Sequence, residues 1–224
     1  MAILKNRCVP YALAAVVAVI GLSGCAKNDS SALVASAKAY MTKSDYSAAS
    51  IQLKSALQTT PDNAEARFLL GKSLLEIGDP AGAETEIRKS LDLKYPADEA
   101  MPSLARSMLA QGKYDKVISE MGNRRPESSQ VRSELGTSVA IAYLAIGDTK
   151  NARASIDAAL AGLPADARGL TVKAQIAATA NNIAEASQFI GAALARLPTD
   201  TDALLVRAQL GMAGQAIASV YQQH

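Results

Sequence analysis

The sequence contains few of the side chains on which catalytic and metal sites depend. Its 224 residues include no tryptophan, two cysteines and one histidine, His224, which is the last residue. A Ser-His-Asp or Cys-His nucleophile system needs a histidine beside the nucleophile, and a zinc site needs several His or Cys ligands. No glycine-rich phosphate loop is visible either. The sequence therefore predicts a protein that is not an enzyme and holds no metal and no cofactor.

Aromatic side chains are also scarce, at 4% of the chain, although 49% of the residues are hydrophobic. Strands are enriched in aromatic and β-branched residues, so this alanine-rich composition argues against a β-sandwich or a barrel. It suits helices that pack on one another through small contact residues. The composition favours an all-α fold.

A pattern of small residues returns every 34 or 35 residues. One column is Ala37, Gly71, Ala105, Ala140, Ala174 and Ala208, and a second is Ala49, Ala83, Val117, Ala152 and Ala186. A glycine column (Gly78, Gly112, Gly147) marks a turn, and Pro61, Pro164 and Pro198 close repeats. This period and pattern resemble the tetratricopeptide repeat, a helix-turn-helix unit that stacks into a solenoid. The resemblance implies an all-α superhelical solenoid over residues 32–214, with five repeats and a truncated sixth.

The array has two irregular places. Gly122 to Pro126 interrupts the second helix of the third repeat, and the next repeat starts one residue late. This segment is either a kink in the array or a degenerate repeat with a longer loop. The sixth repeat has an early turn at Met212 to Gln215, which predicts a stub of a second helix and a short tail over residues 215–224. The array would then either close weakly or belong to a longer repeat protein.

The first 24 residues are predicted to be a lipoprotein signal peptide. Lys5 and Arg7 precede an apolar run from Val9 to Leu22, which is shorter than the about 20 residues of a membrane span. Leu22-Ser23-Gly24-Cys25 resembles a bacterial lipobox, which implies lipidation at Cys25. Residues 25–31 are predicted to be the lipidated cysteine and a tether to the first helix. The alternative is an ordinary secretory signal with a chance cysteine. Ala26, in place of an aspartate after the cysteine, implies the outer membrane.

Processing would leave a neutral chain. The whole sequence has 23 basic and 21 acidic side chains, and the first 24 residues contain Lys5 and Arg7 but no acid. A neutral chain does not attract nucleic acid through bulk charge, so we expect no nucleic-acid partner. Cys25 would be the single cysteine that remains, which excludes an internal disulfide.

The first half of the chain resembles one group of tetratricopeptide lipoproteins more closely. The resemblance begins at the lipobox and continues through Leu33 to Tyr40, Ile51 to Leu57, Asp62 to Gly71, and Tyr95 to Asp98. These stretches are similar to the PrsT-type lipoproteins of the PEP-CTERM/exosortase system, which are far longer. The resemblance implies a scaffold on the periplasmic side of the outer membrane, with protein partners in exopolysaccharide export or envelope protein sorting.

The predicted partner-binding residues follow the first small-residue column. Lys38, Lys72 and Arg106 succeed one another at intervals of 34 residues. On the concave face of a solenoid they would form a basic ladder for an acidic peptide or an anionic polysaccharide. The alternative is that they are solvated charges paired with the acidic column Glu65, Glu99 and Glu134, because exposed pairs of this kind are weak.

Two other groups of residues have structural interpretations. Tyr40 and Tyr143 share one repeat position and are predicted to pack between helices rather than to stack on a ligand. Glu84 and Glu86 form a carboxylate pair that is predicted to lie on a solvated helix face. The leading hypothesis is therefore a lipid-anchored scaffold that holds a protein in its groove. The alternative is a module that binds an anionic polysaccharide directly.

Overall fold

The computed structural model describes residues 29–221, and it describes side chains as far as Met212. The predicted signal peptide (1–24) and the lipidation site Cys25 lie outside the described residues, as does most of the predicted tether. Asp29 caps the first helix, which begins at Ser30. Of the helices in the described part, none is long and apolar enough to cross a membrane.

The described residues form α-helices and no strands, which confirms the all-α prediction. The helices are α1 (Ser30–Met41), α2 (Tyr46–Thr59), α3 (Ala64–Glu76), α4 (Pro80–Asp92), α5 (Ala97–Ala110), α6 (Tyr114–Met121), α7 (Ser129–Ala145), α8 (Thr149–Gly162), α9 (Ala167–Thr179), α10 (Ile183–Arg196) and α11 (Thr201–Tyr221).

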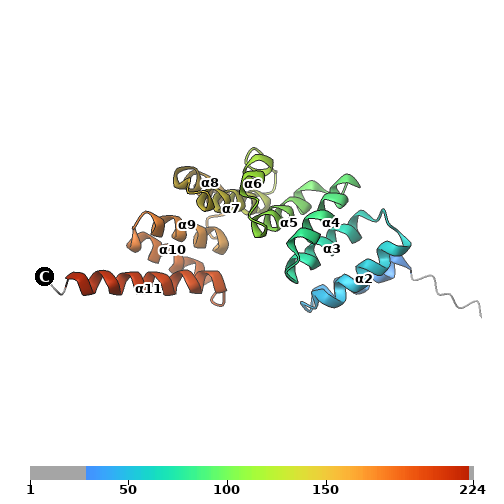
Figure 1. Ribbon diagram of the computed structural model, residues 1–224, viewed down its shortest axis with the longest axis horizontal. Helices are drawn as coiled ribbons and strands as arrows, with labels where there is room; N and C mark the ends of the chain where they lie inside the picture. The colour runs from blue at the N-terminus through green and yellow to red at the C-terminus, as the bar shows by residue number, and fades with distance from the viewer. Residues whose placement is uncertain (1–28, 222–224) are drawn as a thin grey trace, which may run out of the picture.

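Successive helices form antiparallel pairs that stack into a curved array. The backbones of the first helices (α1, α3, α5, α7, α9, α11) approach one another in order, whereas the backbones of the second helices (α2, α4, α6, α8, α10) approach only those of first helices. The first helices therefore make a continuous inner wall, and the second helices lie outside it. Figure 1 shows the resulting arch, with α6 and α8 along its outer edge and α3 and α11 on either side of the opening.

The column of small residues lies where the two helices of a pair touch. Ala37, Ala105, Ala140 and Ala174 are completely buried. At Gly71, an added Cβ would lie 2.5 Å from the Cγ1 atom of Ile87 in the paired helix. Ala208 differs, because it is exposed. No second helix covers it within the described part of the chain, so the small residue there closes no contact.

The turns between paired helices need one residue with a positive φ. Gly78, Gly112 and Gly147 supply it, with φ angles of 84°, 69° and 82°. Asn181 takes this position in the fifth pair at φ 57°, a conformation that asparagine adopts more readily than most residues with a side chain. Ser44 takes it in the first pair at φ 58°, where the sequence has no glycine to signal the turn.

The third pair contains the shortest second helix. α6 has 8 residues, whereas α2, α4, α8 and α10 have 13 or 14. The helix ends before Gly122, and the chain reaches α7 through the loop 122–128. The predicted interruption at Gly122 to Pro126 is confirmed.

The turn predicted at Met212 to Gln215 is wrong, because α11 runs through it as one helix of 21 residues. In four of the pairs an Asp or Asn side chain caps the second helix: Asp45, Asp79, Asp148 and Asn182. The sequence after Met212 contains no Asp, Asn or Pro and is rich in Ala and Gln. Without an Asp or Asn cap like those of the four other pairs, these helix formers continue the existing helix.

Candidate functional site

The inner wall of the arch is the surface on which the predicted ladder residues lie. Lys38, Lys72 and Arg106 belong to α1, α3 and α5, which are three consecutive first helices. Lys38 and Arg106 are exposed and Lys72 is half-buried. The structure therefore brings the three cations to one face at successive repeats. We call this face the groove.

Two of the three cations already have carboxylate partners. The Lys38 Nζ atom lies 2.6 Å from the Oε1 atom of Glu65, a pair that the sequence predicted as the alternative to ligand binding. The Arg106 Nη2 atom lies 3.1 Å from the Oε1 atom of Glu76, which is not in the predicted acidic column. Each pair joins neighbouring repeats. Because all four side chains are at least one-third exposed, each pair is weak and open to exchange with a ligand carboxylate.

Lys72 has an aromatic partner instead. Its Nζ atom lies 5.6 Å from the centroid of the Phe68 ring, within the range of a cation–π contact. The other partner of Phe68 is Tyr95, with 4.5 Å between ring centroids. The Tyr95 hydroxyl donates a hydrogen bond of 2.7 Å to Glu99. Burial and this carboxylate raise the pKa of Tyr95 above its usual range, so the phenol stays protonated.

A hollow of about 360 Å³ lies in the groove between α3, α5 and α7. Its lining combines cations, carboxylates and apolar groups: Phe68, Lys72, Asp98, Glu99, Pro102, Ser103, Arg106, Val131 and Glu134. Charges of both signs beside apolar surface suit a peptide better than a uniformly anionic polymer. The hollow can therefore hold side chains of a bound segment.

The two predicted packing tyrosines are half-buried against the cores. The buried apolar residues form two clusters, an N-terminal one between Val34 and Ala142 and a C-terminal one between Ala140 and Leu210. Tyr40 packs on the N-terminal cluster, and Tyr143 packs on both. Their position agrees with the prediction that they pack between helices. Sequence reasoning missed Phe68 and Tyr95 as groove residues, because their contact joins α3 to the loop before α5 and has no local spacing.

The prediction that Glu84 and Glu86 lie on a solvated face is wrong. Their side chains are only 10% and 13% exposed. Glu86 pairs with Arg67 at 2.7 Å and with Lys89 at 2.8 Å. The sequence places them on α4, but their burial comes from neighbouring helices that the local pattern does not show.

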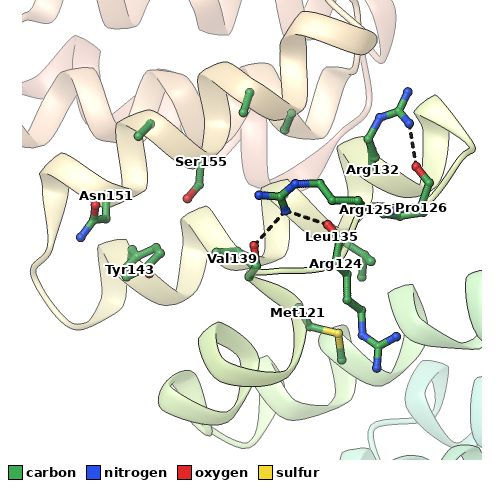
Figure 2. Close-up of a pocket in the computed structure, with 15 residues that line it drawn as sticks. Met121, Arg124, Arg125, Pro126, Arg132, Leu135, Val139, Tyr143, Asn151 and Ser155 are labelled. Atoms are coloured by element: carbon green, nitrogen blue, oxygen red, sulfur yellow. Dashed lines mark hydrogen bonds between the residues drawn. The ribbon is translucent and has the colours of Figure 1, made fainter.

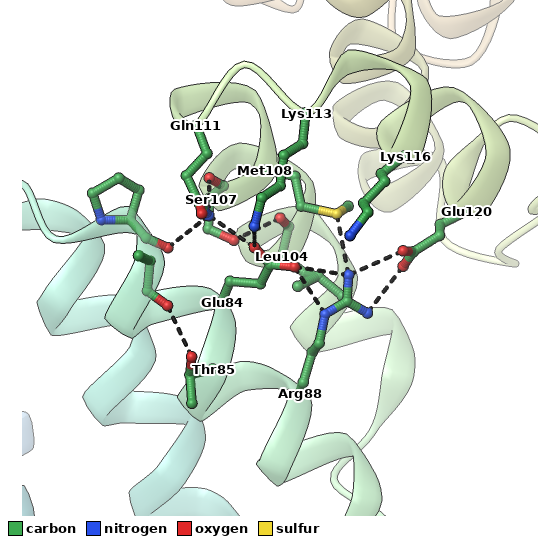
Figure 3. A network of polar contacts seen from close by, with 12 residues as sticks. Glu84, Thr85, Arg88, Leu104, Ser107, Met108, Gln111, Lys113, Lys116 and Glu120 are labelled. Atoms are coloured by element: carbon green, nitrogen blue, oxygen red, sulfur yellow. Dashed lines mark hydrogen bonds and ion pairs between the residues drawn. The ribbon is translucent and has the colours of Figure 1, made fainter.

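Glu84 is the centre of a polar network that joins the second pair to the third (Figure 3). Its carboxylate accepts hydrogen bonds from Lys113 at 2.7 Å, Gln111 at 2.8 Å and Arg88 at 3.0 Å. Arg88 also pairs with Glu120 of α6 at 3.0 Å. Burial alone would raise the pKa of Glu84, but these donors outweigh it and lower the pKa to about 2. The network fixes how α4 sits against α5 and α6.

No cluster of three or more metal-ligating side chains occurs within residues 29–221.

Comparison with known proteins gives a consistent family. Residues 34–102 and 140–201, more than half of the chain, match a family model described as tetratricopeptide repeat. No curated protein matches the chain.

Several solved structures share the fold. Pseudomonas aeruginosa PilF is 15% identical with a TM-score of 0.66, over 87% of this chain and 88% of that one. A thermophilic tetratricopeptide repeat protein from Thermus thermophilus is 19% identical with a TM-score of 0.63, over 82% and 98%. PilW, described as a type IV pilus biogenesis factor, is 18% identical with a TM-score of 0.63, over 88% and 91%.

Proposed function

The chain belongs to the tetratricopeptide repeat family, and from that premise we propose that it is a non-catalytic scaffold that holds a partner protein in its groove. The observation that carries this proposal is the inner wall of first helices, which presents Lys38, Lys72 and Arg106 at successive repeats. Repeat arrays use such extended concave surfaces for binding. The mixed lining of the hollow at Phe68 and Glu99 supports a protein ligand.

The finer part of the proposal is the place and the process. We propose that Cys25 carries a lipid, that the array faces the periplasm from the outer membrane, and that its partners belong to exopolysaccharide export or PEP-CTERM protein sorting. The lipobox-like Leu22 to Cys25 and the similarity of the first half to PrsT-type lipoproteins support this. The likeness to PilF and PilW concerns the fold alone.

Charge reversal in the groove tests the protein-binding proposal. A crosslinked pull-down from gently solubilised envelopes compares the wild type with Lys38→Glu/Lys72→Glu/Arg106→Glu. The matched control is Lys54→Glu/Lys116→Glu/Lys150→Glu, which changes the net charge equally on exposed positions of the second helices α2, α6 and α8. We expect specific partners to be lost from the groove variant and retained by the control.

The other outcomes separate the alternatives. Partners that remain bound to the groove variant contradict docking in the groove. If no protein is captured by any form, while immobilised anionic polysaccharide retains the pure wild type, the polysaccharide alternative replaces the scaffold. The lipid anchor has a separate test: labelled palmitate enters the wild type and is lost on Cys25→Ala, and an unlabelled wild type contradicts it.

A further inference from the structure

The short third pair replaces a recurring leucine with an arginine. Four second helices carry a leucine at one register: Leu57, Leu91, Leu160 and Leu194. All four are buried or half-buried in the apolar clusters. The 34-residue step from Leu91 arrives at Arg125, which lies beyond the end of α6 in the loop 122–128. An exposed cation therefore lies where these four pairs have an apolar side chain.

The facing first helix compensates for part of this loss. Leu160 lies against Gly169 of α9, where an added Cβ would be 2.8 Å from the leucine. The equivalent of Gly169 in α7 is Leu135, which is 4% exposed. Leu135 therefore fills the space immediately beneath the missing leucine. It does not replace the rest of α6.

A hollow of about 400 Å³ remains at this place, bounded by the loop 122–128, α7 and α8. We call it the outer cleft, because it opens between two second helices and not into the groove. Its walls combine polar groups with apolar side chains, among them Val139 and Tyr143 of α7 and Ala154 and Ala158 of α8. Figure 2 shows Arg125 extending across the cleft, whereas Arg124 and Arg132 point away from its centre.

The Arg125 guanidinium has donors to spare. Its Nη1 atom donates to the backbone oxygens of Gly122 at 3.2 Å and Arg124 at 2.9 Å. An arginine has five N–H donors, and no described carboxylate lies within 4.0 Å of Arg124, Arg125 or Arg132. An unneutralised guanidinium that extends over apolar side chains makes a surface that is complementary to an acidic, apolar ligand.

A second hollow, no smaller than the outer cleft, shows the same place with a leucine and an ion pair present. It has about 450 Å³ and lies between α2, α3 and α4, at the equivalent place two pairs earlier. There the leucine is present as Leu57, and Arg67 is paired with Glu86 at 2.7 Å. In this second hollow the chain itself supplies an aliphatic side chain and a carboxylate. The outer cleft lacks both groups.

We propose that the outer cleft binds a segment of a partner protein in which an aliphatic side chain lies next to an aspartate or glutamate. The aliphatic group packs on Val139, Tyr143 and Ala158, and the carboxylate accepts hydrogen bonds from Arg125. A simple anionic polymer would pair with Arg125 but would leave the apolar side chains of the cleft exposed to water. A peptide that carries both an aliphatic side chain and a carboxylate covers both, so a peptide is favoured. This inference rests on the proposed function as a protein-binding scaffold and adds a second contact surface with its own partner chemistry.

The test uses three probes and the full mature chain. The blocked peptide Leu-Glu-Leu-Glu-Leu carries both groups, Leu-Gln-Leu-Gln-Leu lacks the carboxylates, and polyglutamate lacks the leucines. Amide chemical shifts report where each probe binds, and titration gives its affinity. We expect the first peptide to shift the amides of Arg125, Gly136 and Ala158 and to bind at least tenfold more tightly than either of the others.

Two variants and a control locate the interaction. Arg125→Gln removes the charge and Ala158→Phe fills the cleft from an exposed position. Each is expected to weaken binding of the first peptide at least tenfold. Lys54→Gln, which removes a cation from the hollow between α2 and α4, is expected to change it less than twofold.

The opposite results overturn the proposal. It is wrong if the first peptide does not bind at millimolar concentration, if it shifts groove amides such as Lys72 and Ser103 instead, or if polyglutamate binds equally well. It is also wrong if both cleft variants keep wild-type affinity. The pull-down with the groove variant is independent of these measurements. If the peptide does not bind the outer cleft but a partner is still lost on charge reversal in the groove, this inference is wrong and the proposed scaffold function stands.

Discussion

The two halves of the array use the same repeat but hold their pairs together differently. Of the nine ion pairs among the described residues, seven lie between residues 38 and 120 and two between residues 153 and 185. The N-terminal pairs are joined by buried carboxylates such as Glu84. The C-terminal pairs are joined mainly by alanine and isoleucine, as at Ala152 and Ile156.

The difference shows that one backbone arrangement tolerates two kinds of junction. Apolar contacts stabilise the fold roughly in proportion to the area they bury, and they are not directional. Buried ion pairs add little net stability, since desolvation offsets their attraction, but removing one partner leaves an uncompensated charge. We therefore expect the N-terminal half to be more sensitive to polar substitutions and to pH, and the two halves to respond alike to changes in their apolar layer.

The largest expected effect tests the shared apolar layer. Ile87 and Ile156 occupy equivalent positions and are both completely buried. Replacing either by alanine removes the same atoms from a closed core, so Ile87→Ala and Ile156→Ala should each lower the free energy of unfolding by about 4 kcal/mol. Denaturant melts combined with hydrogen exchange measure the loss and the half in which it occurs. A difference of more than about 2 kcal/mol between the variants would contradict a common layer.

The next effect separates the two halves. Glu84→Gln leaves Lys113 without its carboxylate, while Arg88 keeps only Glu120, and we expect a loss of about 3 kcal/mol. Asp157→Asn is the matched control, because it removes the carboxylate of the Lys173 pair while Asp157 is 49% exposed. We expect the control to cost less than about 1 kcal/mol. Equal losses in chemical denaturation would remove the distinction between buried and exposed junctions.

The repeat columns predicted the fold because small residues at helix contacts are a local, periodic signal. The small residues from Ala37 to Ala174 and the turn glycines all have their predicted places. The position of Arg125 could also have been singled out from the sequence, because the equivalent residues Leu57, Leu91, Leu160 and Leu194 are all leucine. That exception becomes visible only when the repeats are compared with one another.

Other features depend on contacts that one sequence window does not contain. Glu84 is buried by Gln111 and Lys113, which come from the next pair, so the pattern of α4 alone predicts a solvated face. Arg106 pairs with Glu76 rather than with the acidic column, because a long arginine side chain can reach several carboxylates and the sequence does not show which is nearest. The continuous helix α11 follows from a capping residue that is missing after Met212, and the small residues there were a stronger but misleading signal.

The pH dependence should also differ between the halves. In the unfolded chain Glu84 has the ordinary pKa of 4.5, and folding lowers it to about 2. A lowered pKa gives stability that is full above pH 4.5 and is lost as the pH falls toward 2. The shift corresponds to about 3 kcal/mol at neutral pH. Glu86, whose pKa is also lowered, changes stability in the same direction.

Hydrogen exchange at pH 7 and pH 3 measures this loss in each half. We expect protection to fall more in α4, α5 and α6 than in α8, α9 and α10. Glu84→Gln provides the control, because the variant has no carboxylate to protonate and its remaining pH dependence should be smaller than that of the wild type. An unchanged pH dependence in the variant would show that other groups are responsible.

The smallest expected effect concerns the exposed pairs of the groove. Lys38 and Glu65 lie 2.6 Å apart, but their side chains are 51% and 45% exposed. Water and salt screen such a pair, so Lys38→Met should change the free energy of unfolding by less than about 0.5 kcal/mol. A double-mutant cycle with Glu65→Gln, measured at low and high salt, isolates the pair energy. A small value means that the pair can open at little cost, which is what a ligand carboxylate needs in order to take Lys38 from Glu65. A coupling above about 1.5 kcal/mol would make Lys38 a fixed part of the wall and remove it from the partner-binding ladder.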